Sequence, residues 1–277
     1  MQNYLYGERG AGFFGYSHFT GGFPGGQAEY VRVPLGEVNL LPIPDDVPDE
    51  KALYLSDVLP TSYHCVVDTV VEKGDTVGVW VGGVICSTRV VTYLSIQQGL
   101  GPIGQCVARW AKLKGAGRII CIDNVPARLD MAKSGGFEVI DFSKERDIPK
   151  KLHELAPGGL DVALDCSESP LMSMDVCHDN VHLGTFHAPK SWLHKGLKLL
   201  MLETDVPEVI NETIVSVRKM GRCGLIAVYA GFTNCFNIGA LMEKSVRFIG
   251  NGQAPVHKYW EELLYDYIKP GKFDPRL

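Results

Sequence analysis

Apolar runs alternate with mixed polar and apolar stretches along most of the chain beyond residue 100. Short apolar runs at residues 118–122, 137–140 and 161–165 predict strands, and the stretches between them at 126–134 and 148–156 predict helices. Strands that alternate with helices are typical of a parallel sheet. This part of the chain is therefore predicted to be α/β.

The same alternation continues to residue 249. The pattern predicts a helix over residues 206–220, a strand over 221–229, a short helix over 238–244 and a last strand over 246–249. Together with the first set, these elements predict a doubly wound parallel sheet of the Rossmann type.

Residues 1 to about 60 have a different character. They are rich in glycine and aromatic residues, and polar and apolar side chains alternate over residues 28–33, as in a strand. Four prolines follow, Pro34, Pro42, Pro44 and Pro48. This segment is predicted to belong to a second, mostly β domain.

A glycine-rich loop precedes the apolar, small-residue run over residues 105–113. Gly99, Gly101 and Gly104 form the pattern GxGxxG, and Asp123 ends a predicted strand nineteen residues later. In a dinucleotide-binding fold these glycines allow a tight turn, close approach to a pyrophosphate and close packing of helix on strand, and the helix N-terminus binds the phosphates. An ordinary loop is the alternative, but an acid at this distance favours a dinucleotide site.

The acid also bears on the choice of cofactor. The Asp123 carboxylate would bind the adenosine ribose hydroxyls and repel a 2′-phosphate, which favours NAD over NADP. Arg128, five residues later, would either cover the adenine and ribose edge or be solvated. NAD is the predicted cofactor.

Composition narrows the class of protein. The 277 residues are 45% hydrophobic with a net charge of −5, which predicts a globular chain that does not bind nucleic acid. No apolar run approaches the length of a membrane span, and no signal-peptide pattern follows Met1. The eight cysteines are scattered without a CxxC pair, which is typical of reduced thiols and predicts a cytoplasmic protein.

Four further segments carry distinctive sequence. They are GGQAEYVRVP at residues 25–34, LSDVLPTSYH at 55–64, KGDTV at 73–77 and GQAPV at 252–256. Together with the glycine loop, Asp123 and Arg128, they resemble the medium-chain zinc-dependent alcohol dehydrogenases, and most closely the glutathione-independent formaldehyde dehydrogenase-like branch. The resemblance covers nearly the whole chain.

The resemblance implies a domain organisation. Residues 1–61 would form part of a GroES-like, β-rich catalytic domain, and residues 62–250 an NAD-binding Rossmann domain. Residues 251–277 would begin the return to the catalytic domain. In the family the last Rossmann strand commonly pairs across a dimer axis, which implies a homo-oligomer.

The resemblance also implies an activity, the transfer of hydride to NAD from a small alcohol or from an aldehyde hydrate such as that of formaldehyde. A catalytic zinc would polarise the substrate oxygen. By position in the LSDVLPTSYH segment, Asp57 would be a zinc ligand and Thr61 would lie beside the nicotinamide.

The chain departs from the family pattern at the zinc site. Such a zinc needs three protein ligands, but residues 1–60 contain no cysteine and a single histidine, His18. The cysteine-rich lobe for a structural zinc is missing too, and both ends of the chain are expected to be truncated. Two alternatives therefore remain, an inactive NAD-binding fragment and a zinc-free medium-chain reductase. Bound zinc separates the dehydrogenase from both, and turnover without zinc separates the reductase from the fragment.

An internal segment interrupts the dinucleotide motif. In a Rossmann unit the first strand leads directly into the glycine turn, yet eighteen residues, 81–98, separate the strand predicted at 76–80 from Gly99. The segment is interpreted as an insertion. The alternative is that the β-branched run at residues 90–96 replaces the first strand and displaces residues 76–80 outward.

The insertion has a testable origin. Valine codons begin with GT and glutamine can be encoded by CAG, so we hypothesise that residues 81–98 translate a retained short intron with GT and AG borders. Spliced transcripts that lack these codons are then expected. Transcript sequencing that found no such form would refute the hypothesis.

Two other groups of residues have alternative interpretations. His64 follows Thr61 on a predicted helix and is either a packing residue or a proton relay. Five residues of types that can bind a metal lie close together in one stretch of the sequence. Their spacing does not match a closed ligand set, which favours solvated or capping side chains. They are Cys177, His178, His182, His187 and His194.

Overall fold

The computed structural model describes residues 14–15, 22–80, 101–145, 147–167, 207–229 and 233–276. The chain divides into two compact units, Met1–Pro44 and Asp45–Leu277. The predicted insertion at 81–98, the first glycine of the loop, His18 and the histidine-rich stretch at 177–194 lie outside the described residues.

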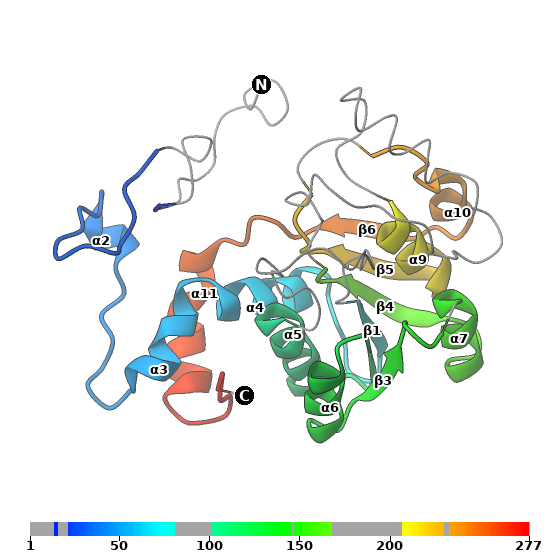
Figure 1. Ribbon diagram of the computed structural model, residues 1–277, viewed down its shortest axis with the longest axis horizontal. Coiled ribbons are helices and arrows are strands. Elements are labelled where there is room, and N and C mark those ends of the chain that lie inside the picture. Colours follow the sequence, from blue (N-terminus) through cyan, green and yellow to red (C-terminus); the bar gives the residue numbers. More distant parts are fainter. Residues whose placement is uncertain are drawn as a thin grey trace, which may run out of the picture. The chain divides into compact units, whose positions relative to one another are not determined.

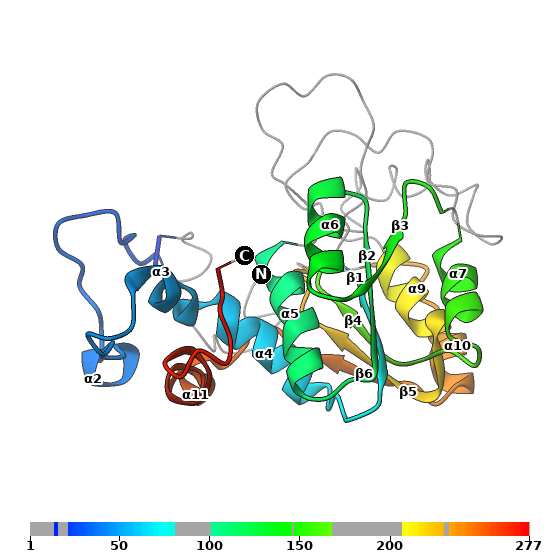
Figure 2. The same ribbon diagram turned by 90° about the horizontal axis from the view of Figure 1, so that it is seen from below.

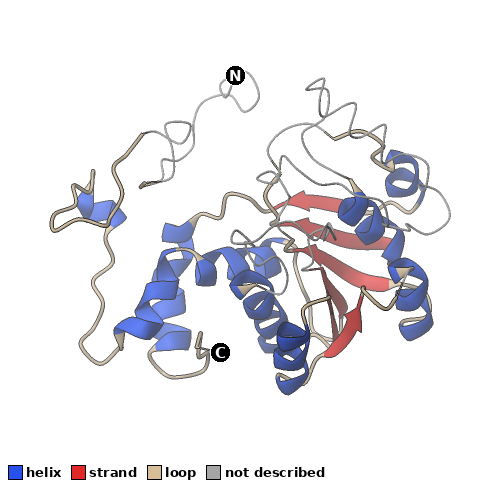
Figure 3. Cartoon of the chain, in the orientation of Figure 1, coloured by secondary structure: helices blue, strands red, loops and turns tan. Residues whose placement is uncertain are grey.

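A six-stranded parallel sheet forms the centre of the larger unit (Figures 1 and 3). Its strands are β1 (Thr76–Trp80), β2 (Arg118–Asp123), β3 (Glu138–Asp141), β4 (Leu160–Asp165), β5 (Val217–Leu225) and β6 (Arg247–Gly250). The strand order is β3-β2-β1-β4-β5-β6. This is the doubly wound order with the reversal between β1 and β4, so the predicted sheet is confirmed.

The position of β1 decides between the two interpretations of the first strand. Residues Thr76 to Trp80 pair in parallel with β2 on one side and with β4 on the other. The central place in the sheet is therefore occupied by residues 76–80, and the alternative that this strand is displaced outward is wrong. The retained-intron origin of residues 81–98 stays a hypothesis.

Helices cover both faces of the sheet (Figure 2). One face carries α5 (Pro102–Leu113) and α6 (Pro126–Ser134), and the other carries α7 (Ile148–Leu155), α9 (Glu208–Ser216) and α10 (Ile238–Glu243). Each of α5, α6 and α7 begins with proline in its first turn, where a missing N–H costs nothing. The predicted helix at 126–134 has the same bounds as α6.

Helix α4 (Val58–Asp68) packs along α5 and carries the LSDVLPTSYH segment toward the sheet. It follows two short helical turns, α3 (Asp49–Ala52) and the 3₁₀ turn Leu53–Ser56. At the end of the chain, α11 (Val256–Glu262) continues into a π-helical turn, Leu263–Ile268, and packs against α4. None of the helices in the described ranges combines the length and the apolar character that a membrane span requires.

The core between the sheet and the α7–α9 face is almost entirely apolar. Buried members from three strands and two helices include Trp80, Ile120, Leu160, Leu152 and Ile214. Burial of side chains of this size contributes about 1.5–3 kcal/mol each. Burial of these apolar side chains, which the sequence places periodically along each element, therefore stabilises the packing of the helices on the sheet.

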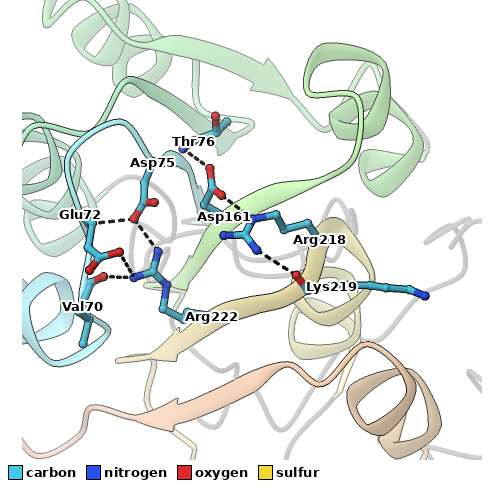
Figure 4. A network of polar contacts seen from close by, with 8 residues as sticks. All are labelled: Val70, Glu72, Asp75, Thr76, Asp161, Arg218, Lys219 and Arg222. Carbon is cyan, nitrogen blue, oxygen red and sulfur yellow. Dashed lines mark hydrogen bonds and ion pairs between the residues drawn. The ribbon is translucent and has the colours of Figure 1, made fainter.

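A polar network joins the amino ends of β1 and β4 to β5 (Figure 4). Arg222 donates to the carboxylate of Asp75 at 2.7 Å, and to the Val70 carbonyl. Nearby, Asp161 accepts from the Thr76 N–H at 2.8 Å and from Arg218 at 2.6 Å. The Arg222–Asp75 pair is almost fully enclosed, with 9% and 10% of the side chains exposed.

The predicted helix at 206–220 is wrong over its last four residues, 217–220. Helix α9 ends at Ser216, and β5 begins at Val217, which pairs with Leu160. Local pattern favours a longer helix here, but pairing with β4 overrides local propensity. The strand predicted at 221–229 therefore starts earlier and ends at Leu225.

The strand predicted at residues 28–33 is not present in the described structure. These residues form no strand pairing and are mostly exposed. Among the described residues of the smaller unit, the β-type pairing is an isolated bridge between Phe14 and Phe23. Its one helix is α2 (Gly36–Asn39) over the residues described there. A strand needs a neighbouring strand to satisfy its backbone hydrogen-bonding groups. The alternation of polar and apolar residues was therefore not sufficient to predict a strand here. The boundaries predicted at residues 61 and 250 stay predictions.

Candidate functional site

The carboxyl edge of the sheet holds the residues predicted to bind the dinucleotide. The strand order reverses between β1 and β4, and doubly wound sheets bind ligands in the crevice at that point. Strands β2, β3 and β4 all end in aspartate, at Asp123, Asp141 and Asp165. The edge is thus lined by carboxyl groups whose surroundings differ.

The amino end of α5 provides hydrogen-bond donors at this edge. Gly101 is the residue before the helix, and the first bond of the helix runs from the Gln105 N–H to the Gly101 carbonyl at 3.2 Å. The N–H groups of Ile103 and Gly104 therefore have no acceptor within the helix. Gly104 is buried, as expected of the glycine that lets helix and strand approach.

Asp123 is completely buried at the end of β2. Its Oδ1 accepts hydrogen bonds from the N–H groups of Asn124 at 2.6 Å and Val125 at 3.0 Å. These bonds hold the carboxylate in one orientation at the start of the turn to α6. The structure therefore places the predicted ribose acceptor on a rigid support.

Two polar atoms of residues that closely follow Asp123 in the sequence have no hydrogen-bond partner within the described part of the chain. They are Nη1 of Arg128 and Oδ1 of Asn124, and both are buried. A buried donor left unpaired costs about 1–3 kcal/mol. An adenosine ribose, which offers both donors and acceptors, would satisfy such groups, so these residues fit a dinucleotide.

The structure also brings together Asp57 and Thr61. Asp57 precedes α4 and Thr61 lies in its first turn, so the Thr61 hydroxyl donates to the Asp57 carboxylate at 2.8 Å. Asp57 is exposed and Thr61 is half-buried. Because α4 packs along α5, the two predicted catalytic residues lie at the start of the helix that adjoins α5, whose amino end is predicted to bind the phosphates.

The surroundings of Asp57 do not form a zinc site in the part of the chain that the structure describes. No three His, Cys, Asp or Glu side chains converge there on a point that could hold a metal ion. The Asp57 carboxylate instead accepts the Thr61 hydroxyl. The described residues therefore do not fit the metal, and we derive no chemical step through it.

His64 is buried one turn after Thr61. Its Nδ1 lies 2.9 Å from the Tyr259 hydroxyl, which connects α4 to α11. Burial lowers the pKa of His64, although the nearby Asp68 carboxylate opposes this shift. A neutral imidazole that joins two helices agrees with the packing interpretation.

The sequence did not identify the polar groups at the end of β4. Asp165 is 1% exposed and accepts hydrogen bonds from the Ser167 hydroxyl at 2.6 Å and the Tyr229 hydroxyl at 2.8 Å. Burial raises the pKa of Asp165, and these hydrogen bonds oppose the shift. The signal was present, because Asp165 ends an apolar strand in the same way as Asp123.

A family model described as zinc-binding dehydrogenase matches residues 102–178. The chain is 39% identical over 272 residues to a zinc-type alcohol dehydrogenase-like protein of Schizosaccharomyces pombe, with 98% of this chain and 56% of the relative covered. It is 38% identical over 273 residues to a glutathione-independent formaldehyde dehydrogenase of Pseudomonas aeruginosa, with 94% and 60% covered. The chain belongs to the medium-chain zinc-dependent alcohol dehydrogenase family.

A solved alcohol dehydrogenase has a similar fold. The alcohol dehydrogenase of Thermus sp. ATN1 superposes with a TM-score of 0.68 at 25% identity, covering 95% of this chain and 60% of that enzyme. The predicted fold class, α/β with a Rossmann sheet and part of a GroES-like domain, is confirmed. The chain spans less than two thirds of the length of these alcohol and formaldehyde dehydrogenases.

Proposed function

We propose that this chain binds NAD along the carboxyl edge of its sheet, as the dinucleotide-binding part of a zinc-type alcohol or formaldehyde dehydrogenase. The observation that carries the proposal is the buried Asp123 carboxylate at the end of β2, together with the unpaired, buried Nη1 of Arg128 on the following helix α6. The names of the relatives support a small alcohol or an aldehyde as the substrate. Free, mostly buried cysteines in the described residues support a cytoplasmic location.

Each residue of the site has a task in this proposal. The N–H groups at the start of α5 bind the pyrophosphate, with Gly101 leaving room for its approach. Asp123 accepts the ribose hydroxyls and excludes a 2′-phosphate, and Arg128 covers the adenosine side. When bound, NAD supplies the acceptor for a hydride. Thr61 borders the place of the nicotinamide, and Asp57 orients Thr61 by accepting the hydrogen bond that its hydroxyl donates.

A second candidate function is NAD binding without turnover. It is favoured by the hydrogen bond between Thr61 and Asp57, which engages the one carboxylate that the family resemblance assigns to zinc. Losing a Lewis acid removes several kcal/mol of stabilisation of the developing charge. The two candidates share the dinucleotide site and differ only in chemistry.

Substituting Asp123 tests the dinucleotide site. The wild-type chain is expected to bind NADH at least about tenfold more tightly than NADPH. Asp123→Asn keeps a side-chain acceptor for the N–H groups of Asn124 and Val125 but removes the charge. NADH affinity should then fall about tenfold, because a hydrogen bond to a charged group contributes about 1.5–3 kcal/mol. Discrimination against NADPH should fall with it. Fluorescence titration of bound NADH measures both constants.

Asp141→Asn is the matched control. Asp141 ends the neighbouring strand β3 and accepts from the Ser143 N–H at 3.0 Å, so it makes the same local contact one strand farther from the reversal between β1 and β4. NADH affinity should be unchanged in this variant. Equal losses in the two variants, or no loss in either, would contradict the assignment of Asp123.

Metal content and turnover separate the two candidate functions. We would measure zinc, and NAD reduction with formaldehyde and with simple alcohols, on the full chain and on a variant lacking residues 81–98. Stoichiometric zinc with turnover supports the dehydrogenase. NADH binding without zinc or turnover supports the second candidate, and turnover without zinc would point to a zinc-free reductase.

A further inference from the structure

The last residue of β1 is tied to helix α9. Trp80 is 2% exposed, and its indole N–H donates to the Glu212 carboxylate at 3.1 Å. The two residues are 132 positions apart in the sequence. The bond therefore connects the strand that precedes the glycine loop to a helix of the opposite half of the sheet.

The Trp80 ring is held by its apolar surroundings on both sides. It belongs to the core cluster that includes Leu152 of α7 and Ile214 of α9. On the strand side, a Cβ added at Gly78 would lie only 2.7 Å from the ring. The ring has little freedom to move, so the direction of its N–H, and with it the preferred place of the Glu212 carboxyl, is set by packing.

Three acidic groups from three elements surround Glu212. Glu208 lies one turn earlier on α9, Asp147 caps the amino end of α7, and Asp165 ends β4. Burial raises the pKa of Glu212 to about 7, these three carboxyl groups add to the shift, and the Trp80 hydrogen bond opposes it. Lys244 binds the Ile214 and Val215 carbonyls at the carboxyl end of α9. Glu212 therefore changes charge near neutral pH.

We propose that Glu212 is a positioning residue of the dinucleotide site, which holds the carboxyl end of β1 through Trp80 and couples NAD(H) affinity to its own protonation. The inference rests on the proposed function. Both protonation states can accept the indole N–H, so the tie to β1 persists. Only the ionised state adds a negative charge beside the carboxyl end of β1, the strand that precedes the predicted pyrophosphate site.

The direction of the effect follows from the charge. Above neutral pH Glu212 is ionised and repels the pyrophosphate, so NADH affinity falls as the pH rises. By linkage, bound NADH favours the protonated form, and binding near pH 7 takes up protons. A charge–charge repulsion of this kind in a partly screened site changes affinity about three- to tenfold.

The test is a series of NADH titrations on the full chain between about pH 6 and about pH 8.5. Wild type should lose about three- to tenfold in affinity with a midpoint near pH 7. Glu212→Gln keeps an acceptor for Trp80 and removes the charge, so its affinity should lack this transition and stay close to the low-pH value of the wild type. Proton uptake on binding, measured in buffers of different ionisation enthalpy, should disappear in the same variant.

Two further variants should move the midpoint in opposite directions. Trp80→Phe removes the hydrogen bond that favours the ionised carboxyl, so the midpoint should rise. Asp147→Asn keeps a cap for α7, where the Asp147 side chain accepts from the Lys150 N–H, and removes a negative charge, so the midpoint should fall. If the role of Glu212 were purely structural, neither variant would shift the midpoint of the pH dependence.

The outcomes distinguish this inference from the function on which it rests. If wild type binds no NADH at any pH, both are overturned. If wild type binds NADH but Glu212→Gln shows the same pH profile and the same proton uptake, this inference alone is overturned. Opposite shifts in the Trp80 and Asp147 variants, together with a flat profile for Glu212→Gln, would support it.

Discussion

Replacing Arg222 by methionine is expected to lower the free energy of unfolding by about 3–5 kcal/mol, because it leaves the carboxylate of Asp75 buried without its counter-ion. The pair is enclosed between β5 and the amino end of β1, with 2.7 Å between guanidinium nitrogen and carboxylate oxygen (Figure 4). Arg222 also binds the Val70 carbonyl, which would lose its donor. Urea unfolding followed by circular dichroism measures the change.

The chain offers two matched controls for this prediction. Arg218 lies on the same strand and pairs with Asp161, but 45% of its side chain is exposed, so Arg218→Met should cost at most about 1 kcal/mol. Removing both partners, in Asp75→Ala with Arg222→Met, should cost less than Arg222→Met alone, since no buried charge remains. Equal losses for Arg218→Met and Arg222→Met would show that burial of the pair does not govern its contribution.

Alanine at Gly159 is expected to destabilise the chain by about 3–5 kcal/mol. Gly159 precedes β4 with a φ of +96°, which already disfavours a side chain by about 1–2 kcal/mol. An added Cβ would also lie 2.7 Å from the Arg218 backbone nitrogen of β5. A strand backbone cannot swing aside as a flexible side chain can, so β4 and β5 would have to separate.

Gly158 is the control for the steric part of this effect. Its φ is also +96°, but nothing lies within 4 Å of an added Cβ. Gly158→Ala should therefore cost only about 1–2 kcal/mol, the conformational part alone. Chemical unfolding of the two variants side by side gives the difference, and similar losses would rule out the clash with β5 as the cause.

Local signals were sufficient where an element depends mainly on its own residues. Helix α6 has the predicted bounds because its first turn carries Pro126 and its end is marked by Gly135 and Gly136. The residues predicted to bind the dinucleotide, Gly101, Gly104 and Asp123, were likewise proposed from a motif whose parts lie within about two dozen positions. Such signals arise from short-range sterics and capping, which the sequence displays directly.

Local signals failed where a strand needs a partner. Residues 217–220 continue a helical pattern, yet β5 starts at Val217 because β4 lies beside it. Residues 28–33 alternate as a strand does, yet no neighbour pairs with them in the part of the chain that the structure describes. Backbone pairing is a property of two segments, so one segment alone cannot predict it.

The sequence by itself determined the α/β class, the parallel sheet, the dinucleotide motif and the family, because periodicity and motifs depend on residues that are close together in the sequence. Only the tertiary structure decided that residues 76–80 form the central strand and that Asp57 binds Thr61. It alone brought Glu212 to Trp80 and Arg222 to Asp75, across 132 and 147 positions. Buried polar groups must find partners wherever the topology places them, and that placement follows from the packing of the whole sheet.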